Sequence, residues 1–122
     1  MKPVNHIKIN SAMSVNELVK QMDSAGILGA GRLGKAADIC EAMIKDKDCT
    51  VFLGLAGPLV PGGMREIIID IIENKWVDVV VATGATLTHD LGEALGCRHY
   101  QGDANADDVE LHKKGLDRVY ES

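Results

Sequence analysis

The sequence has few aromatic residues, no excess of positive charge and no long hydrophobic run. Aromatics make up 3% of the 122 residues, and 13 Lys and Arg face 18 Asp and Glu, for a formal net charge of −5. This balance disfavours a protein that binds phosphate backbones, so nucleic acid is not an expected partner. The longest apolar run, residues 67–72, is broken by Asp70 and is far shorter than the roughly 20 residues of a membrane span. We therefore expect no membrane segment.

Cysteine is also scarce, with Cys40, Cys49 and Cys97 as its three occurrences. An odd number without a C-x-x-C pair predicts neither a disulfide framework nor a closed zinc site. Cys97 and His99 lie near His89 in sequence, but no second ligand pair completes a tetrahedron, so we expect no metal. The N-terminus lacks the apolar segment of a secretory signal. These features predict a cytoplasmic protein.

Two helices are predicted in the first third of the chain. Ser14 and Glu17 form a capping box, which starts a helix that residues 23–26 end. A second apolar stripe predicts a helix over about 32–46. Residues 1–48 are therefore interpreted as a helical N-terminal segment.

The remainder, residues 49–122, reads as a βαβα core. Short apolar runs predict strands that are buried on both faces, and a helix between two such strands makes them parallel. The predicted elements are a strand over 49–55, a loop over 56–63, a helix over 64–73, a strand over 77–83, a loop over 84–86, a helix over 88–95, a possible short strand over 99–102, a helix over 107–114 and the start of a strand over 116–120.

This pattern predicts an α/β fold, a Rossmann-like parallel sheet with flanking helices. Typical sheets have about four to six strands, whereas only two can be placed firmly here. We therefore interpret residues 1–122 as a single partial α/β domain.

A literal G-x-G-x-x-G occurs at Gly29, Gly31 and Gly34. The dinucleotide fingerprint requires a strand before the glycines, and a helix precedes them here. We interpret the motif as a connection between two helices. The alternative is a free-standing dinucleotide-binding domain that uses these glycines.

The loops that follow the two strands are better placed for a ligand. Open α/β sheets bind ligands outside the carboxyl ends of their strands, so residues 57–63 and 83–86 form a candidate wall, with ordinary tight turns as the alternative. His89 beside Asp90 could serve as an acid, a base or a polar anchor, or could be a solvated neighbour of a helix start. Arg65 and Glu66 are interpreted as exposed helix charges, and His99 carries no signal.

Residues 50–57, 61–66, 77–85 and 89–91 resemble the N-terminal half of deoxyhypusine synthases, and more closely the deoxyhypusine synthase-like branch. The likeness runs from about residue 14 to residue 120. It implies an NAD-dependent transfer of the aminobutyl group of spermidine to a lysine of the hypusine-bearing translation factor, or to a small amine. In this family NAD accepts a hydride from the polyamine and returns it after an imine forms on an enzyme lysine.

The resemblance also implies site residues. The cofactor-binding residues would be Gly57, Pro58, Leu59, Val60, Pro61, Thr83, Gly84 and Ala85. The family's Thr-Ser-Asn in the first loop is here Ala56, Gly57 and Pro58, which removes side-chain hydrogen bonds to the cofactor. An acidic residue that helps hold the polyamine aligns with His89, which is therefore the predicted substrate-binding residue. No catalytic residue is assigned, because the lysine that forms the imine belongs to a C-terminal half that this sequence lacks.

The resulting hypothesis is the N-terminal part or a split subunit of a deoxyhypusine synthase-like enzyme, inactive alone and completed by a C-terminal chain or a paralogue in an oligomer. The alternative is a non-catalytic regulatory or scaffolding subunit of a full-length paralogue. The sequence leaves open the amine acceptor, the identity of the completing chain and the oligomeric state.

Overall fold

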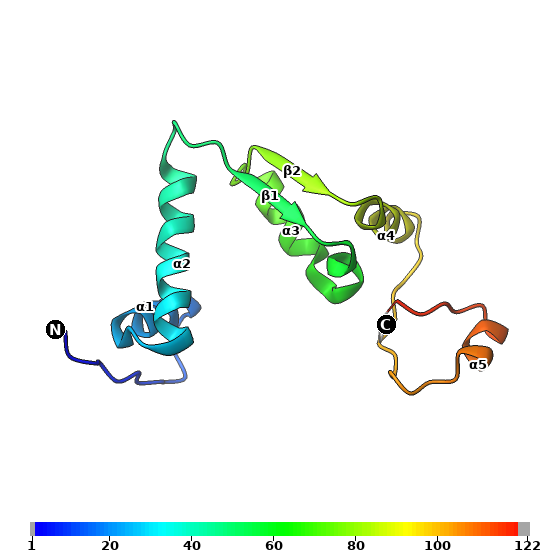
Figure 1. Cartoon of the computed structure of the whole chain (residues 1–122), viewed down its shortest axis with the longest axis horizontal. Helices are drawn as coiled ribbons and strands as arrows, with labels where there is room; N and C mark the ends of the chain where they lie inside the picture. Colours follow the sequence, from blue (N-terminus) through cyan, green and yellow to red (C-terminus); the bar gives the residue numbers. More distant parts are fainter. Residues whose placement is uncertain (1, 120–122) are drawn as a thin grey trace. The chain divides into compact units, whose positions relative to one another are not determined.

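The computed structural model describes residues 2–119 and divides into two compact units, Met1–Thr50 and Val51–Ser122 (Figure 1). The first unit is helical and the second has α/β architecture.

The first unit consists of helices α1 (Val15–Ala25) and α2 (Leu28–Lys45). The predicted capping box is present: Glu17 N–H donates to Ser14 Oγ at 3.2 Å, and Ser14 N–H donates to Glu17 Oε2 at 2.8 Å. These two bonds satisfy amides that the first turn of a helix otherwise leaves free. The Ser14 amide lowers the pKa of the Glu17 carboxyl by donating to it, and the Ser14 hydroxyl, which donates to Oε2 at 2.9 Å, lowers it further. Gly26 ends α1 in the left-handed region at φ 71°.

Helix α2 begins at Leu28 rather than at residue 32, so the prediction that Gly29–Gly34 connects two helices is wrong. The glycines lie inside α2, where two of them allow close packing of α1 and α2. A Cβ on Gly34 would lie 2.3 Å from Asp23 Cβ, and one on Gly31 would lie 2.5 Å from the Gly26 carbonyl carbon. Such distances are sterically impossible, so only glycine allows this helix crossing.

The second unit contains strands β1 (Phe52–Leu55) and β2 (Val79–Ala82), which pair in parallel, with Phe52 opposite Val79 and Leu55 opposite Ala82. Helix α3 (Arg65–Glu73) forms the crossover between them. The predicted βαβ unit is therefore confirmed. Asp78 adds a bond at the entry of β2, where its Oδ2 accepts from the Val51 amide at 2.7 Å.

The sheet is covered on one face only. Leu55, Val80 and Ala82 line a groove of about 150 Å³ together with isoleucines of α3, and α3 lies against the paired strands in Figure 1. The opposite face carries Phe52, which is 65% exposed, and Val81, which is 57% exposed. The prediction of strands buried on both faces is wrong for this structure, because two strands and one crossover helix leave the second face without a covering layer.

The rest of the second unit differs from the sequence-based expectation at several points. Helix α4 spans Gly84–Ala94, so the predicted loop over 84–86 is instead its first turn. Residues 57–64 form a 3₁₀ turn, η1 (Gly57–Leu59), and a wider π-helical turn, η2 (Val60–Met64), that bends at Gly63, rather than an open loop. Helix α5 spans Asp108–Lys113. Residues 99–102 and 116–119 form no strand, and Tyr120 lies outside the described residues.

Candidate functional site

The carboxyl ends of β1 and β2 bring the two predicted cofactor segments together. We call residues 57–61 and 83–85 the strand-end site. A Cβ on Gly57 would lie 3.1 Å from Ala85 Cβ and 3.3 Å from Thr83 Oγ1, so the two segments are in van der Waals contact. Thr86 Oγ1 donates to the Ala56 carbonyl oxygen at 3.4 Å and links them again. This contact follows from the parallel register, because Leu55 and Ala82 are paired at the ends of the strands.

The residues of the strand-end site do not all face outward. Val60 is 4% exposed and is the buried apolar side chain of the described residues, while Leu59 and Pro61 are half-buried. Thr86, at 6% exposure, is buried beside them. The side chain of Val60 therefore supports the turn from beneath, and any ligand contact in this segment falls to its neighbours.

The first turn of α4 has the properties of an anion site. Thr83 is the N-cap, but its side chain makes no capping bond to the first-turn amides. A Cβ on Gly84 would meet no atom within 4 Å, so there is open space at this position. In this first turn the Thr86 amide donates to the Thr83 carbonyl oxygen at 3.1 Å. The amides of Gly84 and Ala85 are the ones left for a ligand, and the helix dipole is positive at this end. The site can therefore accept a phosphate group.

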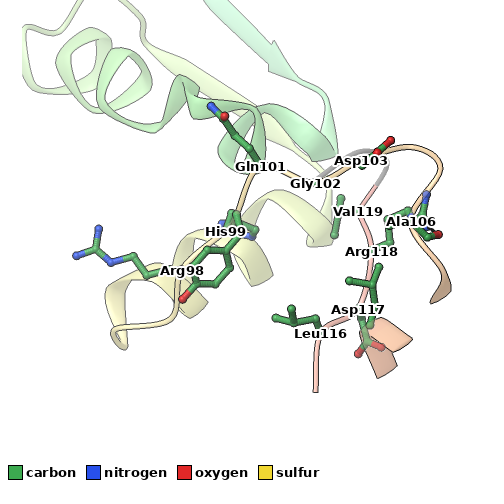
Figure 2. A pocket seen from close by; sticks show the side chains of 12 residues that line it. Arg98, His99, Gln101, Gly102, Asp103, Ala106, Leu116, Asp117, Arg118 and Val119 are labelled. Carbon is green, nitrogen blue, oxygen red and sulfur yellow. Dashed lines mark hydrogen bonds between the residues drawn. The ribbon is translucent and has the colours of Figure 1, made fainter. Parts of the chain in front are cut away.

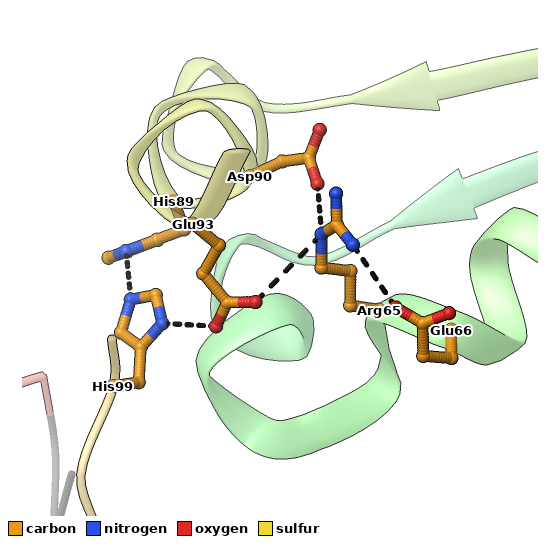
Figure 3. Close-up of polar contacts among 6 residues, drawn as sticks. All are labelled: Arg65, Glu66, His89, Asp90, Glu93 and His99. Carbon is orange, nitrogen blue, oxygen red and sulfur yellow. Dashed lines mark hydrogen bonds and ion pairs between the residues drawn. The ribbon is translucent and has the colours of Figure 1, made fainter. Parts of the chain in front are cut away.

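A second group of polar residues lies farther along α4. We call Arg65, Glu66, His89, Asp90, Glu93 and His99 the polar cluster (Figure 3). Arg65 Nε donates to Asp90 Oδ1 at 2.7 Å and lies 3.8 Å from Glu93 Oε2, which ties the start of α3 to α4. The Arg65 guanidinium also pairs with Glu66 at 3.1 Å. The hydrogen bond to Asp90 raises the pKa of Arg65.

Two imidazoles and a carboxylate form a chain within the polar cluster. His89 Nδ1 lies 3.0 Å from His99 Nε2, and His99 Nδ1 lies 2.7 Å from Glu93 Oε1. The two rings meet edge to face, with centroids 5.0 Å apart. The side chains of His99 and Glu93 are only 21% and 29% exposed, so water competes weakly for these bonds.

Sequence reasoning missed most of this cluster. Arg65 was expected to be an exposed helix charge, but it is 29% exposed and bonded to Asp90. His99 was given no role, yet it bonds His89 across ten residues. The available signal was the spacing of His89 and Glu93, four residues apart on a predicted helix and hence on one face.

A separate pocket of about 160 Å³ lies in the segment after α4 (Figure 2). Arg118 organises its wall by donating to the carbonyl oxygens of Ala104 and Ala106 at 2.7 and 2.5 Å and to Asp108 at 2.6 Å. The pocket shares no lining residue with the strand-end site. His99 belongs to both the pocket wall and the polar cluster.

Within residues 2–119, no group of three or more His, Cys, Asp or Glu side chains is arranged to hold a metal ion. The three cysteines are unpaired thiols. Among the helices of this part of the chain, none combines the length and the apolar character needed to cross a membrane.

Comparison with known proteins identifies the relatives of this chain. The family model described as deoxyhypusine synthase matches residues 17–122. A probable deoxyhypusine synthase from Methanothermobacter thermautotrophicus is 46% identical over 116 residues, which cover 95% of this chain and 38% of the relative. A probable deoxyhypusine synthase from Methanosarcina thermophila is 45% identical over 98% of this chain and 37% of its own length.

The synthase-like branch is represented as well. A deoxyhypusine synthase-like protein from Chlorobaculum parvum is 40% identical over 99% of this chain and 34% of its own length. The chain thus spans slightly more than a third of the length of the curated relatives that it matches. Since the family model covers most of its residues, the chain belongs to the deoxyhypusine synthase family.

Proposed function

We propose that this chain supplies part of the NAD site of a deoxyhypusine synthase-like aminobutyl transferase and that another polypeptide completes the enzyme. The observation that carries the proposal is the contact of Gly57 with Thr83 and Ala85, beside the open first turn of α4. These are the segments that the family resemblance assigns to the cofactor. When bound, NAD would accept a hydride from the carbon next to the amine of the polyamine.

The residues present fit a dinucleotide in a specific way. The amides at the start of α4 are suited to the diphosphate, and Gly84 leaves room for it to approach the backbone. Gly57 keeps the facing turn close to Thr83, whose hydroxyl lies 3.4 Å from that of Thr86. Because Thr86 donates its proton to the Ala56 carbonyl, Thr83 donates to Thr86, and the Thr83 oxygen can still accept from a ribose hydroxyl. Backbone groups thus replace the side-chain contacts that the family's Thr-Ser-Asn would make.

The need for a second polypeptide is supported by the uncovered face of the sheet. Phe52 and Val81 expose large apolar side chains on a two-stranded sheet, a surface that parallel sheets normally bury under another layer. The chain also corresponds to little more than a third of its relatives' length. Spermidine, the amine acceptor and an oligomeric assembly in the cytoplasm belong to this proposal, as does inactivity of the chain alone.

The test is NAD binding by the chain with a blocked first turn of α4. Gly84→Val fills the open space above the amides and prevents their hydrogen bonds to the NAD diphosphate. Such charge-assisted bonds are worth roughly 1.5–3 kcal/mol, so we expect the Kd for NAD to rise about 10-fold to 100-fold. The matched control is Gly29→Ala, which also meets no atom within 4 Å but lies in the glycine motif of α2. Calorimetry should show wild-type affinity for the control. Weakened binding by Gly29→Ala with an unaffected Gly84→Val would instead support the glycine motif as the NAD site.

The regulatory alternative is separated by co-expression. Spermidine-dependent NADH formation is expected when this chain is paired with a chain that carries the missing part of the family fold. A change in activity that occurs only when the chain is paired with a full-length paralogue would support a regulatory or scaffolding subunit. This alternative is based on the coverage of the relative, because the chain matches only 38% of its length.

A further inference from the structure

The hydrogen bonds that link His89, His99 and Glu93 determine which nitrogen of each neutral imidazole carries the proton. Glu93 is acceptor-only when ionised, so a neutral His99 bonded to it must carry its proton on Nδ1. His99 Nε2 is then an acceptor, and a neutral His89 must donate to it from Nδ1. This leaves a lone pair on His89 Nε2, which has no hydrogen-bond partner among the residues that the structure describes.

We propose that His89, His99 and Glu93 form a proton relay in which His89 Nε2 takes a proton from an ammonium group of the substrate. The proposal rests on the proposed function, because it assigns the predicted substrate-binding residue His89 its chemical role toward a polyamine. His89 would be the proton acceptor, and His99 and Glu93 would be positioning residues that act through it. A neutral imidazole acceptor thus replaces the acidic residue that aligns with His89 in the family.

The step balances between the substrate and two rings. The substrate ammonium loses an N–H bond and becomes a neutral amine, its proton forms an N–H bond on His89 Nε2, and the His89 Nδ1–H bond breaks as that proton passes to His99 Nε2. His89 returns to a neutral ring with its proton on Nε2, and His99 becomes an imidazolium. The positive charge then rests beside the Glu93 carboxylate, 2.7 Å away, rather than on the ring that faces the substrate.

The charged neighbours favour this end state. From α3, the Arg65 guanidinium lies 3.8 Å from Glu93 Oε2 but bonds Asp90 at 2.7 Å, so most of its charge is matched by Asp90 and Glu66. Glu93 Oε1 stays directed at His99. On α4, Asp90 and Glu93 are the acidic groups of the cluster, and from the following segment His99 is the basic one. No other cation is paired with Glu93 in the described structure.

The relay makes a prediction that a purely structural pair would not. Histidine tautomers are distinguished by the ring nitrogen signals in NMR, and this chain has only four histidines. At neutral pH, His89 and His99 should both carry the proton on Nδ1. On acidification, the first proton should appear on His99 while His89 changes in the same transition from the Nδ1–H to the Nε2–H form. His6 and His112 lie outside the cluster and serve as internal controls.

The matched variants are Glu93→Gln and Glu66→Gln. Both remove one carboxylate from the polar cluster, but Glu66 contacts Arg65 and neither imidazole. Glu93→Gln should abolish the coupled change of His89, and Glu66→Gln should retain it. Unchanged fluorescence of Trp76, which lies in the same unit as the cluster, shows that each variant is folded. His99→Gln provides a second test, since His89 should then lose its preference for the Nδ1–H form.

Two results would overturn the relay: a His89 ring that carries its proton on Nε2 at neutral pH, or a first proton that settles on His89 without involving His99. Neither depends on NAD or on a completing chain. If the coupled change of His89 and His99 is absent while Gly84→Val still weakens NAD binding, the relay is wrong and the proposed cofactor site stands. If the coupled change is present but the chain does not bind NAD, the relay stands and the proposed cofactor site is wrong.

Discussion

The two units of this chain use glycine in opposite ways. In α2, Gly31 and Gly34 are packed so closely against α1 that a single added carbon would overlap its backbone. At the strand-end site, Gly84 faces open space at the start of α4. The first unit has the glycine spacing of a dinucleotide fingerprint. The second unit has the strand followed by a helix start, which is the context that this fingerprint requires. Position relative to a strand and a helix start, rather than letter spacing, therefore distinguishes the packing glycines of α2 from the glycine that faces open space.

The largest effect that would test this contrast is expected for Gly34→Ala. Its Cβ would lie 2.3 Å from Asp23 Cβ, so α1 and α2 must separate, and overpacking of this kind costs about 3 kcal/mol. Hydrogen exchange measured peptide by peptide should show loss of protection in α1 and α2. Gly84→Ala should leave protection in the second unit unchanged because the space there is open. Equal destabilisation by both variants would remove the distinction.

A smaller effect is expected for Ser14→Ala at the start of α1. The substitution removes the acceptor of the Glu17 amide, and loss of an N-cap typically costs about 1 kcal/mol. Exchange protection should fall in α1 and remain in the second unit. Ser11→Ala is a suitable control, since Ser11 precedes the capping box and caps no helix. Full protection of α1 in Ser14→Ala would show that packing against α2 alone holds the helix.

The second unit depends more on charge pairing, which Asp90→Asn tests. The substitution weakens the bond from Arg65 that joins α3 to α4, and partly exposed ion pairs contribute modestly, so we expect the Tm to fall by roughly 2–4 °C. The chain's single tryptophan, Trp76, lies in this unit and reports its unfolding by fluorescence. Added salt should reduce the difference between wild type and variant. A salt-independent difference would indicate a packing role for Asp90 instead.

The smallest effect concerns pH and the first unit. The pKa of Glu17 is lowered from 4.5 by its bonds to Ser14, so the stabilisation is present above pH 4.5 and is lost as pH falls through the folded-state pKa. Protection of α1 should therefore decrease slightly between about pH 5 and pH 3. Glu17→Gln should lack this decrease. An identical pH response in the variant would assign the effect to other carboxylates.

The sequence predicted the elements that depend on neighbouring residues. The capping box located the start of α1, and the alternation of apolar runs and glycines predicted the parallel βαβ unit. The rule that ligands bind at strand ends placed Gly57 and Thr83 in one candidate site. The boundaries were predicted less well. The predicted loop over residues 84–86 is the first turn of α4, although glycine and threonine are weak helix formers.

Only the tertiary structure decided which distant residues meet. His99 lies in an irregular segment whose path no periodicity predicts, and its contact with His89 and Glu93 depends on that segment folding back along α4. The close crossing of α1 and α2 at Gly31 and Gly34 is likewise a fact about two backbones rather than about a motif. Local sequence determines hydrogen bonds and apolar faces within a few turns. Contacts between segments depend on packing of the whole unit, and they gave this chain its polar cluster and its close helix contacts at Gly31 and Gly34.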